Sequence, residues 1–238
     1  MRVESATIVP RASSAAMTNV TPSISFGLID GRPVFMDERD DSYFLLERDF
    51  EAKFVKHLAN ADGALPATPE LVDALGLDEN SGSVAIARCE RPRRSLVVET
   101  HARVRPRLAD ALSLASILHR TRRSLTGRPI ETLLADLVDA DDECAEQVQL
   151  ERLTRRARRF LTARPLVPFK ANCLLDSLAL LSWLGSARRG SMLVFGVKLD
   201  PFAAHCWVQT GGLLLNDRVD NVERFGPVRV LKCSAVTR

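Results

Sequence analysis

The chain has 238 residues, of which 46% are hydrophobic, a proportion typical of a protein with a packed core. Its 33 Lys and Arg residues nearly balance 30 Asp and Glu residues, for a net charge of +3, which argues against binding nucleic acid or an acidic membrane through charge alone. The 5 cysteines are widely spaced and form no CxxC pair or Cys/His cluster, so we expect free thiols, no disulfide framework and no metal site.

The longest apolar runs and the first residues bear on where the protein works. No run reaches the roughly 18 apolar residues that a membrane-spanning helix needs, and residues 1–20 lack the apolar centre of a signal peptide. Residues 1–20 are rich in small and polar side chains, so we expect a disordered segment, or a true start at Met17. With free thiols, this predicts a cytoplasmic protein that does not contact membranes.

Residues 21–82 have the pattern of a small domain. Three short apolar runs, ISFGLI, PVFM and YFLL, are separated by Asp30-Gly31 and by a charged run from Asp37 to Asp41, which predicts a three-stranded antiparallel sheet. Apolar residues at helical spacing follow from Phe50 to Leu58. A Thr-Pro-Glu start then predicts a second short helix over residues 68–75. Sheet and helices together predict a small domain that ends near residue 80.

The rest of the chain changes from turn signals to helices and then to strands. Residues 83–106 contain SGS, RPRR and RVRP around one strand candidate, Ser95 to Glu99, and we interpret them as a linker. Residues 107–238 start with helical patterns and continue with NCLLDSLALLSWLG, which predicts a buried helix. The strand candidates SMLVFGVKL, AAHCWVQ, GLLLND and VRVLK follow it. The whole pattern predicts the α+β class.

His205 lies in one strand candidate and Asp217 ends the next. A three-residue turn over 210–212 (TGG) would pair Gln209 with Leu213 and place His205 directly opposite Asp217. Opposite residues of an antiparallel pair have Cβ atoms roughly 4.5–5.5 Å apart, so the carboxylate could accept from one imidazole nitrogen. Asp217 would then orient the ring and stabilise its protonated form.

The nucleophile is predicted to be Cys173 rather than Cys206. Adjacent side chains of a strand point to opposite faces, so Cys206 cannot be the partner of its neighbour His205. Cys173 starts the predicted buried helix, where unpaired N–H groups and the helix dipole favour a thiolate and could hold an oxyanion. Each residue alone is most often structural. Their joint order favours a Cys173–His205–Asp217 triad, as in papain-like and transglutaminase-like enzymes.

Three further features each keep two interpretations. Asn216 could orient His205, or it could serve as an ordinary turn or edge residue. Trp207 shares a strand face with His205 and could shield the ion pair, or it could fill the core. The Arg-rich stretch from Arg152 to Arg159 could bind an acidic peptide or a phosphate, although a solvated helix face fits this pattern better.

The residues of the second half also resemble a known family, the lasso peptide biosynthesis B proteins. The resemblance covers roughly residues 108–235 and lies in NCLLDSLALLSWL, VFGVKLDPFAAHCWVQTGG and LNDRVD. The string FGVKLDPFAAHCWV is specific to that family, whereas the isolated triad is not. The resemblance implies a transglutaminase-like cysteine peptidase over residues 107–238 that uses Cys173, His205 and Asp217. Asp176 and Cys206 stand where the family more often has other residues.

The resemblance also implies what this peptidase acts on and with. It would remove the leader from a ribosomally made lasso precursor in the biosynthesis of a microcin-like antibiotic, before a separate cyclase of the asparagine-synthetase type closes the macrolactam. Residues 21–82 look like the precursor-recognition element of this family, which implies a winged-helix-like domain in which the leader adds as a strand to the small sheet. The third strand, Ser42 to Leu46, is our candidate for that edge. We expect no tightly bound cofactor, and any role of ATP would come through the cyclase.

Two other classes of function stay open at this point. The same triad would serve another thiol acyl-transfer enzyme, such as a transglutaminase or an amidase. The chain could also be a non-catalytic peptide-binding module, or a winged helix that binds DNA. Acidic residues outnumber basic ones over residues 47–79, the reverse of a helix that faces phosphates, so we expect no nucleic-acid partner.

Overall fold

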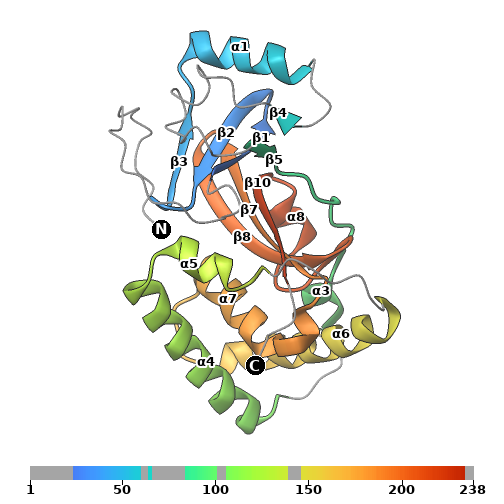
Figure 1. Cartoon of the computed structure of the whole chain (residues 1–238). Helices are drawn as coiled ribbons and strands as arrows, with labels where there is room; N and C mark the ends of the chain where they lie inside the picture. The colour runs from blue at the N-terminus through green and yellow to red at the C-terminus, as the bar shows by residue number, and fades with distance from the viewer. Residues whose placement is uncertain (1–23, 60–63, 66–83, 101–105, 139–145, 234–238) are drawn as a thin grey trace. The chain divides into compact units, whose positions relative to one another are not determined.

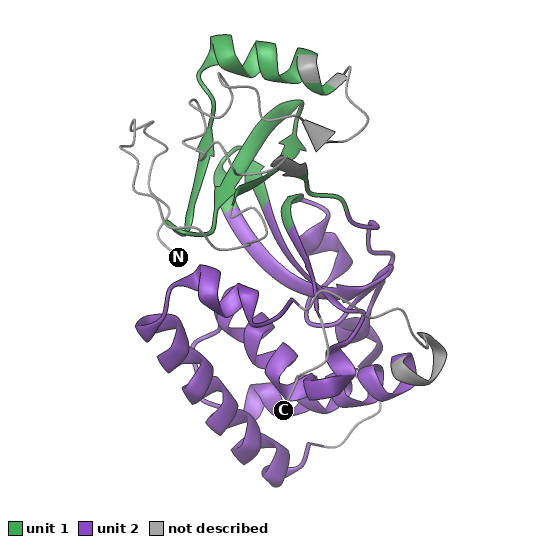
Figure 2. Cartoon of the chain, in the orientation of Figure 1, with its two compact units in different colours: residues 1–88, 197–203, 226–229 green, residues 89–196, 204–225, 230–238 purple. Residues whose placement is uncertain are grey.

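The computed structural model describes residues 24–59, 64–65, 84–100, 106–138 and 146–233 (Figure 1). The predicted disordered segment 1–20 and the predicted helix over 68–75 lie outside these residues. The chain divides into two compact units (Figure 2). Unit 1 comprises residues 1–88, 197–203 and 226–229, and unit 2 comprises residues 89–196, 204–225 and 230–238. The division into a leader-recognition domain, a linker and a peptidase domain stays a prediction.

The sheet of unit 1 is built around an antiparallel meander. Strand β1 (Ile24–Ile29) pairs with β2 (Arg32–Asp37), and β2 pairs with β3 (Ser42–Leu45). Two short strands, β5 (Val84–Ile86) and β4 (Ala64–Leu65), extend the sheet on the other side of β1, in the order β3-β2-β1-β5-β4. The predicted three-stranded antiparallel sheet is confirmed, and β3 lies at its edge.

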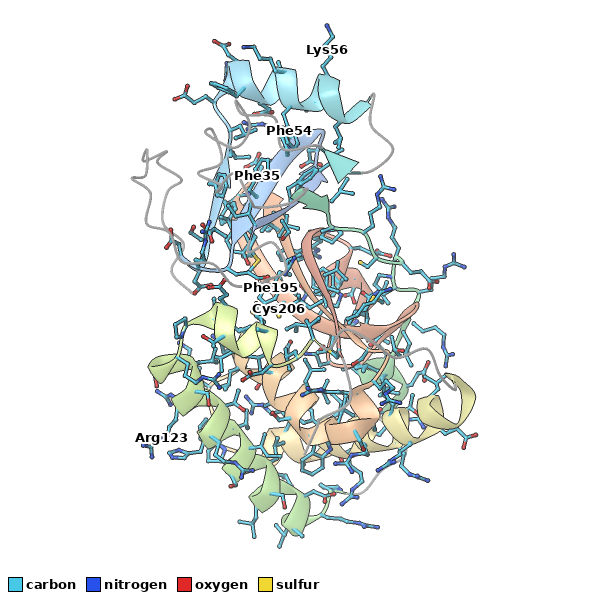
Figure 3. All side chains as sticks on the ribbon, viewed as in Figure 1. Phe35, Phe54, Lys56, Arg123, Phe195 and Cys206 are labelled. Atoms are coloured by element: carbon cyan, nitrogen blue, oxygen red, sulfur yellow. The ribbon has the colours of Figure 1, made fainter. Side chains whose placement is uncertain are left out.

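One helix covers the aromatic face of this sheet. Helix α1 (Arg48–Ala59) follows β3 and brings Phe54 onto the rings of Phe26 and Phe35, at centroid distances of 5.0 and 5.3 Å. Phe35 and Phe54 point toward each other between the helix and the strands (Figure 3). These rings are almost completely buried. Aromatic rings therefore lie at the centre of the core of unit 1, with Ile24 and Leu46 buried beside them.

A late segment of the chain completes unit 1. The backbone of β1 passes so close to residues 226–229 that a Cβ on Gly27 would lie 1.9 Å from the carbonyl oxygen of Pro227. The hydroxyl of Ser25 donates to the carbonyl of Val228 at 2.8 Å. Only glycine fits at position 27, because any side chain would displace one of the two backbones.

Unit 2 begins with helices that surround one buried helix. Helix α4 (Leu108–Gly127), α5 (Ile130–Ala135) and α6 (Glu146–Ala163) precede α7 (Cys173–Leu184), which packs against α4 and α6. Leucine and alanine side chains lie on nearly every face of α7 and are buried, as the sequence predicts. Gly185 ends the helix with a φ of 56°, a value that favours glycine.

The second sheet follows α7. Strands β7 (Met192–Leu199), β8 (Phe202–Thr210) and β10 (Gly226–Lys232) agree with three of the four predicted strands. The fourth is much shorter than predicted, since β9 contains only Leu213–Leu214. The strand order is β10-β7-β8-β9-β6, where β6 is Arg94–Ser95. With helices preceding this sheet, the predicted α+β class is confirmed.

The strand predicted from Ser95 to Glu99 is wrong. Only Arg94–Ser95 forms a strand, and helix α3 (Leu96–Thr100) follows it. The β-branched valines favour a strand locally, but the buried residues Leu96 and Thr100 lie one helical turn apart. The Ser95 hydroxyl also accepts from the N–H of Val98 at 3.4 Å, a weak N-terminal cap. Packing of α3 on α6 thus outweighs strand propensity.

Two arginines of the Arg-rich stretch tie helices together. Arg159 forms an ion pair with Asp110 of α4, and Arg156 donates to the carbonyl of Trp183 in α7. These groups are therefore engaged inside unit 2, whereas Arg152 and Arg155 are exposed.

None of the helices in the described ranges has the length and apolar character that a membrane crossing requires.

Candidate active site

Cys173 is the first residue of α7 and is half-buried. Asn172 caps the helix, because its side-chain oxygen accepts from the N–H of Leu175 at 2.9 Å. This cap fixes the point at which the backbone turns into the helix, and it therefore fixes where the thiol points. Backbone N–H groups of Leu174 and Cys206 interact with the sulfur. The thiol thus lies among donors that favour a negative charge.

His205 stands on β8 between two acidic partners. Its Nε2 atom makes a short hydrogen bond with Oδ2 of Asp217, and both side chains are 17% exposed. The imidazole also interacts with the thiol of Cys173. Because Asp217 occupies Nε2, the other nitrogen, Nδ1, is left for the sulfur. The structure therefore brings together all three side chains that the sequence singled out.

Two aromatic rings enclose the imidazole. Trp207 stacks on His205 at a centroid distance of 6.0 Å, and Phe225 lies 5.1 Å away in a tilted orientation. Trp207 is 1% exposed and donates through its indole N–H to the side chain of Gln209 at 2.8 Å. Trp207 is therefore a core residue whose ring also lies against the imidazole, and shielding of the His205–Asp217 pair stays a prediction.

The predicted register of the β8–β9 hairpin is wrong by one residue. Thr210 pairs with Leu213 and Gln209 with Leu214, so the turn contains only Gly211 and Gly212. An uninterrupted ladder in this register would put Arg218, not Asp217, opposite His205. The ladder is interrupted, because β9 ends at Leu214 and the chain bends over residues 215–217. The bend lets Asp217 reach the imidazole by another path.

Asn221 is a contact of the triad that the sequence did not reveal. Its Nδ2 atom lies 3.1 and 3.2 Å from the two carboxylate oxygens of Asp217 and 3.4 Å from Nε2 of His205. It is carried by the short helix α8 (Val219–Val222), which places it one turn after Asp217. The spacing of four residues in DRVDN is the signal for this contact in the sequence, because a helical turn over this segment brings Asp217 and Asn221 together.

Asn216 makes no hydrogen bond to the imidazole of His205 in the described structure. Its side-chain oxygen accepts from the N–H of Val208 at 2.8 Å, and its Nδ2 donates to the hydroxyl of Ser177 at 2.9 Å. Neither contact involves the imidazole. The alternative role, a residue at a strand edge, describes it better.

The surroundings set the charge of the Cys173–His205 pair. Burial lowers the pKa of His205, but hydrogen bonds to Asp217 and to Cys173 outweigh it and raise the pKa to about 9. Burial raises the pKa of Cys173, but the hydrogen bond and the charge of His205 outweigh it and lower the pKa overall. The lowered pKa of Cys173 and the raised pKa of His205 both favour a thiolate paired with an imidazolium.

Asp217 remains ionised for the same kind of reason. Burial raises the pKa of its carboxyl, but the hydrogen bonds from His205, from the N–H of Arg218 and from Asn221 lower it overall. A carboxylate next to the imidazolium stabilises the protonated ring. The group can therefore hold His205 in one orientation over the whole reaction.

Cys206 is in the opposite condition. It is 1% exposed, and burial raises the pKa of its thiol well above the ordinary value. Its side chain does not share a strand face with His205, as expected from the alternation along β8. Such a thiol is inert at neutral pH.

An ion pair secures the loop that leads into α7. Arg164 pairs with Asp176 at 2.8 Å and also donates to the carbonyls of Val167 and Phe169, at 3.3 and 3.2 Å. Asp176 lies one turn after Cys173 on the same helix. The guanidinium thus joins the approach loop to the first turn that carries the thiol.

Within the described ranges, no three His, Cys, Asp or Glu side chains are grouped so that they could hold a metal ion. We therefore assign no metal ligand. The arrangement that remains is a thiol, a base and an orienting carboxylate, which suits nucleophilic attack on a carbonyl.

Comparison with known proteins agrees with this geometry. Residues 96–230, more than half of the chain, match the model of the transglutaminase-like superfamily. A stretch of 49 residues is 45% identical to the microcin J25-processing protein McjB of Escherichia coli and covers 21% of this chain and 24% of that protein. The match thus spans about a quarter of the length of this relative. No solved structure matches the chain. The chain belongs to the transglutaminase-like superfamily.

Proposed function

We propose that this protein is a cysteine peptidase that removes the leader from a ribosomally made lasso peptide precursor. The observation that carries the proposal is the meeting of Cys173, His205 and Asp217, which come from three separate segments. The likeness to a microcin-processing protein supports the choice of substrate. The superfamily supports acyl-transfer chemistry at a cysteine.

The geometry suggests how the reaction proceeds. The Cys173 thiolate attacks the carbonyl of the last leader residue, and the N–H groups at the start of α7 stabilise the oxyanion. His205 then gives its proton to the leaving amine, which becomes the free N-terminus of the core peptide. Water, deprotonated by His205, attacks the thioester, releases the leader as a carboxylic acid and restores the thiolate. Asp217 holds the ring throughout.

Unit 1 is proposed to bind the leader. Strand β3 lies at the edge of its sheet, and all its residues are partly exposed. An extended leader could add to this edge through main-chain hydrogen bonds, while side-chain pockets supply the specificity. This role agrees with the expectation for Ser42–Leu46 and assigns residues 21–82 to precursor recognition.

The partners follow from the product. Leader removal exposes the amine that a macrolactam needs, so the next step belongs to a separate cyclase of the asparagine-synthetase type. ATP would be used by that cyclase, and we propose no cofactor for this chain. We further propose that the protein works in the cytoplasm, where its thiols stay reduced, without membrane or nucleic acid.

The test is incubation with a lasso precursor peptide, in the presence of the fluorescent amine dansylcadaverine, followed by mass spectrometry. We expect a free leader acid and a free core peptide, with no product from the Cys173→Ala variant. Incorporation of the amine would instead identify a transglutaminase. Binding of the precursor without any cleavage, by protein together with its cyclase, would identify a non-catalytic module.

A further inference from the structure

A hydrogen-bond bridge connects the three segments that carry the residues of the site. The hydroxyl of Ser177, which is completely buried, donates to the carbonyl of Cys206 at 3.2 Å and accepts from Nδ2 of Asn216 at 2.9 Å. Oδ1 of Asn216 accepts from the N–H of Val208 at 2.8 Å. Two side chains thereby connect α7, β8 and the segment after β9.

The bridge explains why the β8–β9 ladder stops where it does. Leu215 donates its N–H to the carbonyl of Val208 at 2.9 Å, as one half of an ordinary antiparallel pair. In such a pair Val208 would donate back to the carbonyl of Leu215. It donates to the side chain of Asn216 instead. The amide oxygen thus replaces a backbone carbonyl, which frees the chain to leave the sheet at this point.

Leaving the sheet at this point is what brings the correct residue to the imidazole. Without the exchange, the ladder would continue and place Arg218 opposite His205. With it, the chain bends over 215–217, and the Asp217 carboxylate bonds to Nε2 of the ring. A cation in that place would oppose the imidazolium that the site contains.

Each group in the bridge is also a close neighbour of one triad residue. Ser177 lies one helical turn after Cys173, Cys206 follows His205, and Asn216 precedes Asp217. Any shift in the bridge therefore moves the thiol, the imidazole or the carboxylate with it. The hydroxyl and the amide make directional hydrogen bonds to all three segments. Buried apolar side chains make no directional bonds and could not hold these segments in register.

We propose that Ser177 and Asn216 are positioning residues that hold the segments of Cys173, His205 and Asp217 in their reactive arrangement. The inference rests on the proposed function of this triad and adds to it the residues that set its geometry. Neither side chain contacts the reacting atoms. Their effect on the reaction passes through the placement of the thiol against the imidazole, where a shift of about 1 Å can cost about 100-fold in rate.

The test compares Ser177→Ala and Asn216→Ala with a matched control, Ser191→Ala. Ser191 is also completely buried in unit 2, but its hydroxyl donates to the carbonyl of Arg188 and has no contact with the triad. Iodoacetamide labelling of Cys173 is followed from pH 5 to 10 by peptide mass spectrometry. Thermal unfolding of each variant checks the fold.

Both bridge variants are expected to label Cys173 about 10- to 100-fold more slowly at pH 6 and to move the midpoint of labelling upward, toward that of an ordinary thiol. Ser191→Ala should label like the unchanged protein. With the precursor peptide, kcat should fall while KM stays within about twofold, because leader binding is not affected. The double variant should lose little more than either single one.

A pair of equal shape separates the hydroxyl from packing. Ser177→Thr keeps the hydroxyl and Ser177→Val removes it, while both add the same bulk. Faster labelling at pH 6 in the Ser177→Thr variant would support the bridge. Equal labelling in the two would contradict it, as would bridge variants that label like Ser191→Ala. If Ser177→Ala fails to fold, Asn216→Ala decides, since that side chain is only partly buried.

The labelling result does not depend on which carbonyl compound is the substrate. If Cys173→Ala still cleaves the precursor, the proposed function is wrong, whatever the bridge variants do. If Cys173 is required but the bridge variants behave like the control, only the bridge is wrong.

Discussion

Two cysteines lie next to His205 and differ in their chemistry. One is at the start of α7, and the other is in the middle of β8. Cys173 is half-buried, with an imidazole and backbone N–H groups around its sulfur. Cys206 is adjacent to His205 in the sequence but is buried, with the pKa of its thiol raised. Reactivity therefore follows the environment that the fold creates, not distance along the chain.

The difference also shows where this protein places buried polar groups. Around Cys173 the polar side chains of His205, Asp217 and Asn221 are joined by hydrogen bonds in one connected set. In the core of unit 1, by contrast, aromatic rings contact one another. Burial of polar groups costs free energy unless they are paired, so a connected set of this kind indicates a place where chemistry is performed.

Removal of the sulfur should have the largest effect. Cys173→Ala is expected to abolish leader removal, because no other group in the site can attack the carbonyl. Cys206→Ala should keep nearly full activity and lose only about 1–2 kcal/mol of stability from the small cavity. Cleavage of the precursor, followed by mass spectrometry, checks both. Activity that survives in Cys173→Ala but not in Cys206→Ala would reverse the assignment.

Removal of the imidazole should reduce the difference in pKa between the thiols of Cys173 and Cys206. In His205→Ala the hydrogen bond and the charge that lower the pKa of Cys173 are gone, so the pKa should rise and cleavage should fall by about a thousandfold or more. The measurement is the rate of cleavage and the pH midpoint of Cys173 labelling. A midpoint that did not move would show that His205 does not control the thiol.

His205 should lose its positive charge at high pH, which ends its attraction to the negatively charged groups beside it. His205 has a folded-state pKa of about 9, above its ordinary value of 6.5, so the ion pair contributes stability that is fully present below pH 6.5 and is lost as the pH rises through 9. Cleavage should also decline through about pH 9, as the general acid loses its proton. Thermal unfolding and cleavage from pH 6 to 10 measure both effects. A decline already complete at pH 7 would contradict the raised pKa.

Changes to the carboxylate and its partner should have smaller, graded effects. Asp217→Asn keeps the shape but removes the charge that favours the imidazolium, and a loss of at least about 100-fold in kcat is expected. Asn221→Ala removes one donor to Asp217 and should cost only about tenfold. The two losses should not add in the double variant, since both act through Asp217. Full additivity would mean that Asn221 acts elsewhere.

Loss of the Arg164–Asp176 ion pair, which joins the approach loop to α7, should have the smallest effect on the rate of the reaction. Arg164→Gln removes the ion pair with Asp176 and the bond to Phe169, and should destabilise the protein by about 1–3 kcal/mol with a loss of labelling of only a few-fold. Arg128→Gln, which breaks the exposed pair with Asp136, is the control and should change stability by less than about 1 kcal/mol. Urea unfolding compares them. Equal losses of stability in the two variants would show that the Arg164–Asp176 pair contributes no more than an exposed ion pair.

The elements that surround the site could be predicted from local pattern. The apolar run of α7 and the alternation of β8 placed Cys173 at a helix start and separated Cys206 from His205. These features depend on periods of about 3.6 and 2 residues, which the sequence shows directly. The three-stranded sheet of unit 1 was equally clear, because Asp30 and Gly31 mark its first turn and both have a positive φ.

The details that bring Asp217 to His205 could not be predicted in this way. The sequence predicts a three-residue turn in the β8–β9 hairpin, whereas the turn contains only two glycines. The contact of Asp217 with His205 depends instead on the side chain of Asn216, whose oxygen replaces a backbone carbonyl. Such an exchange has no periodic signal. Helix α3 was missed because its valines favour a strand, and packing on α6 decides otherwise. Ser177 looked like one more residue of a buried helix.

The most direct test of the central claim is competitive labelling of the unchanged protein with a small amount of iodoacetamide at pH 6, followed by peptide mapping. At this pH an ordinary thiol with a pKa of roughly 8.5 is almost wholly protonated. Cys173, held as a thiolate by His205, is expected to take nearly all the label, and Cys206 none. Cys173 should lose this advantage in His205→Ala. Preferential labelling of any other cysteine, or equal labelling of Cys173 with and without His205, would contradict the account.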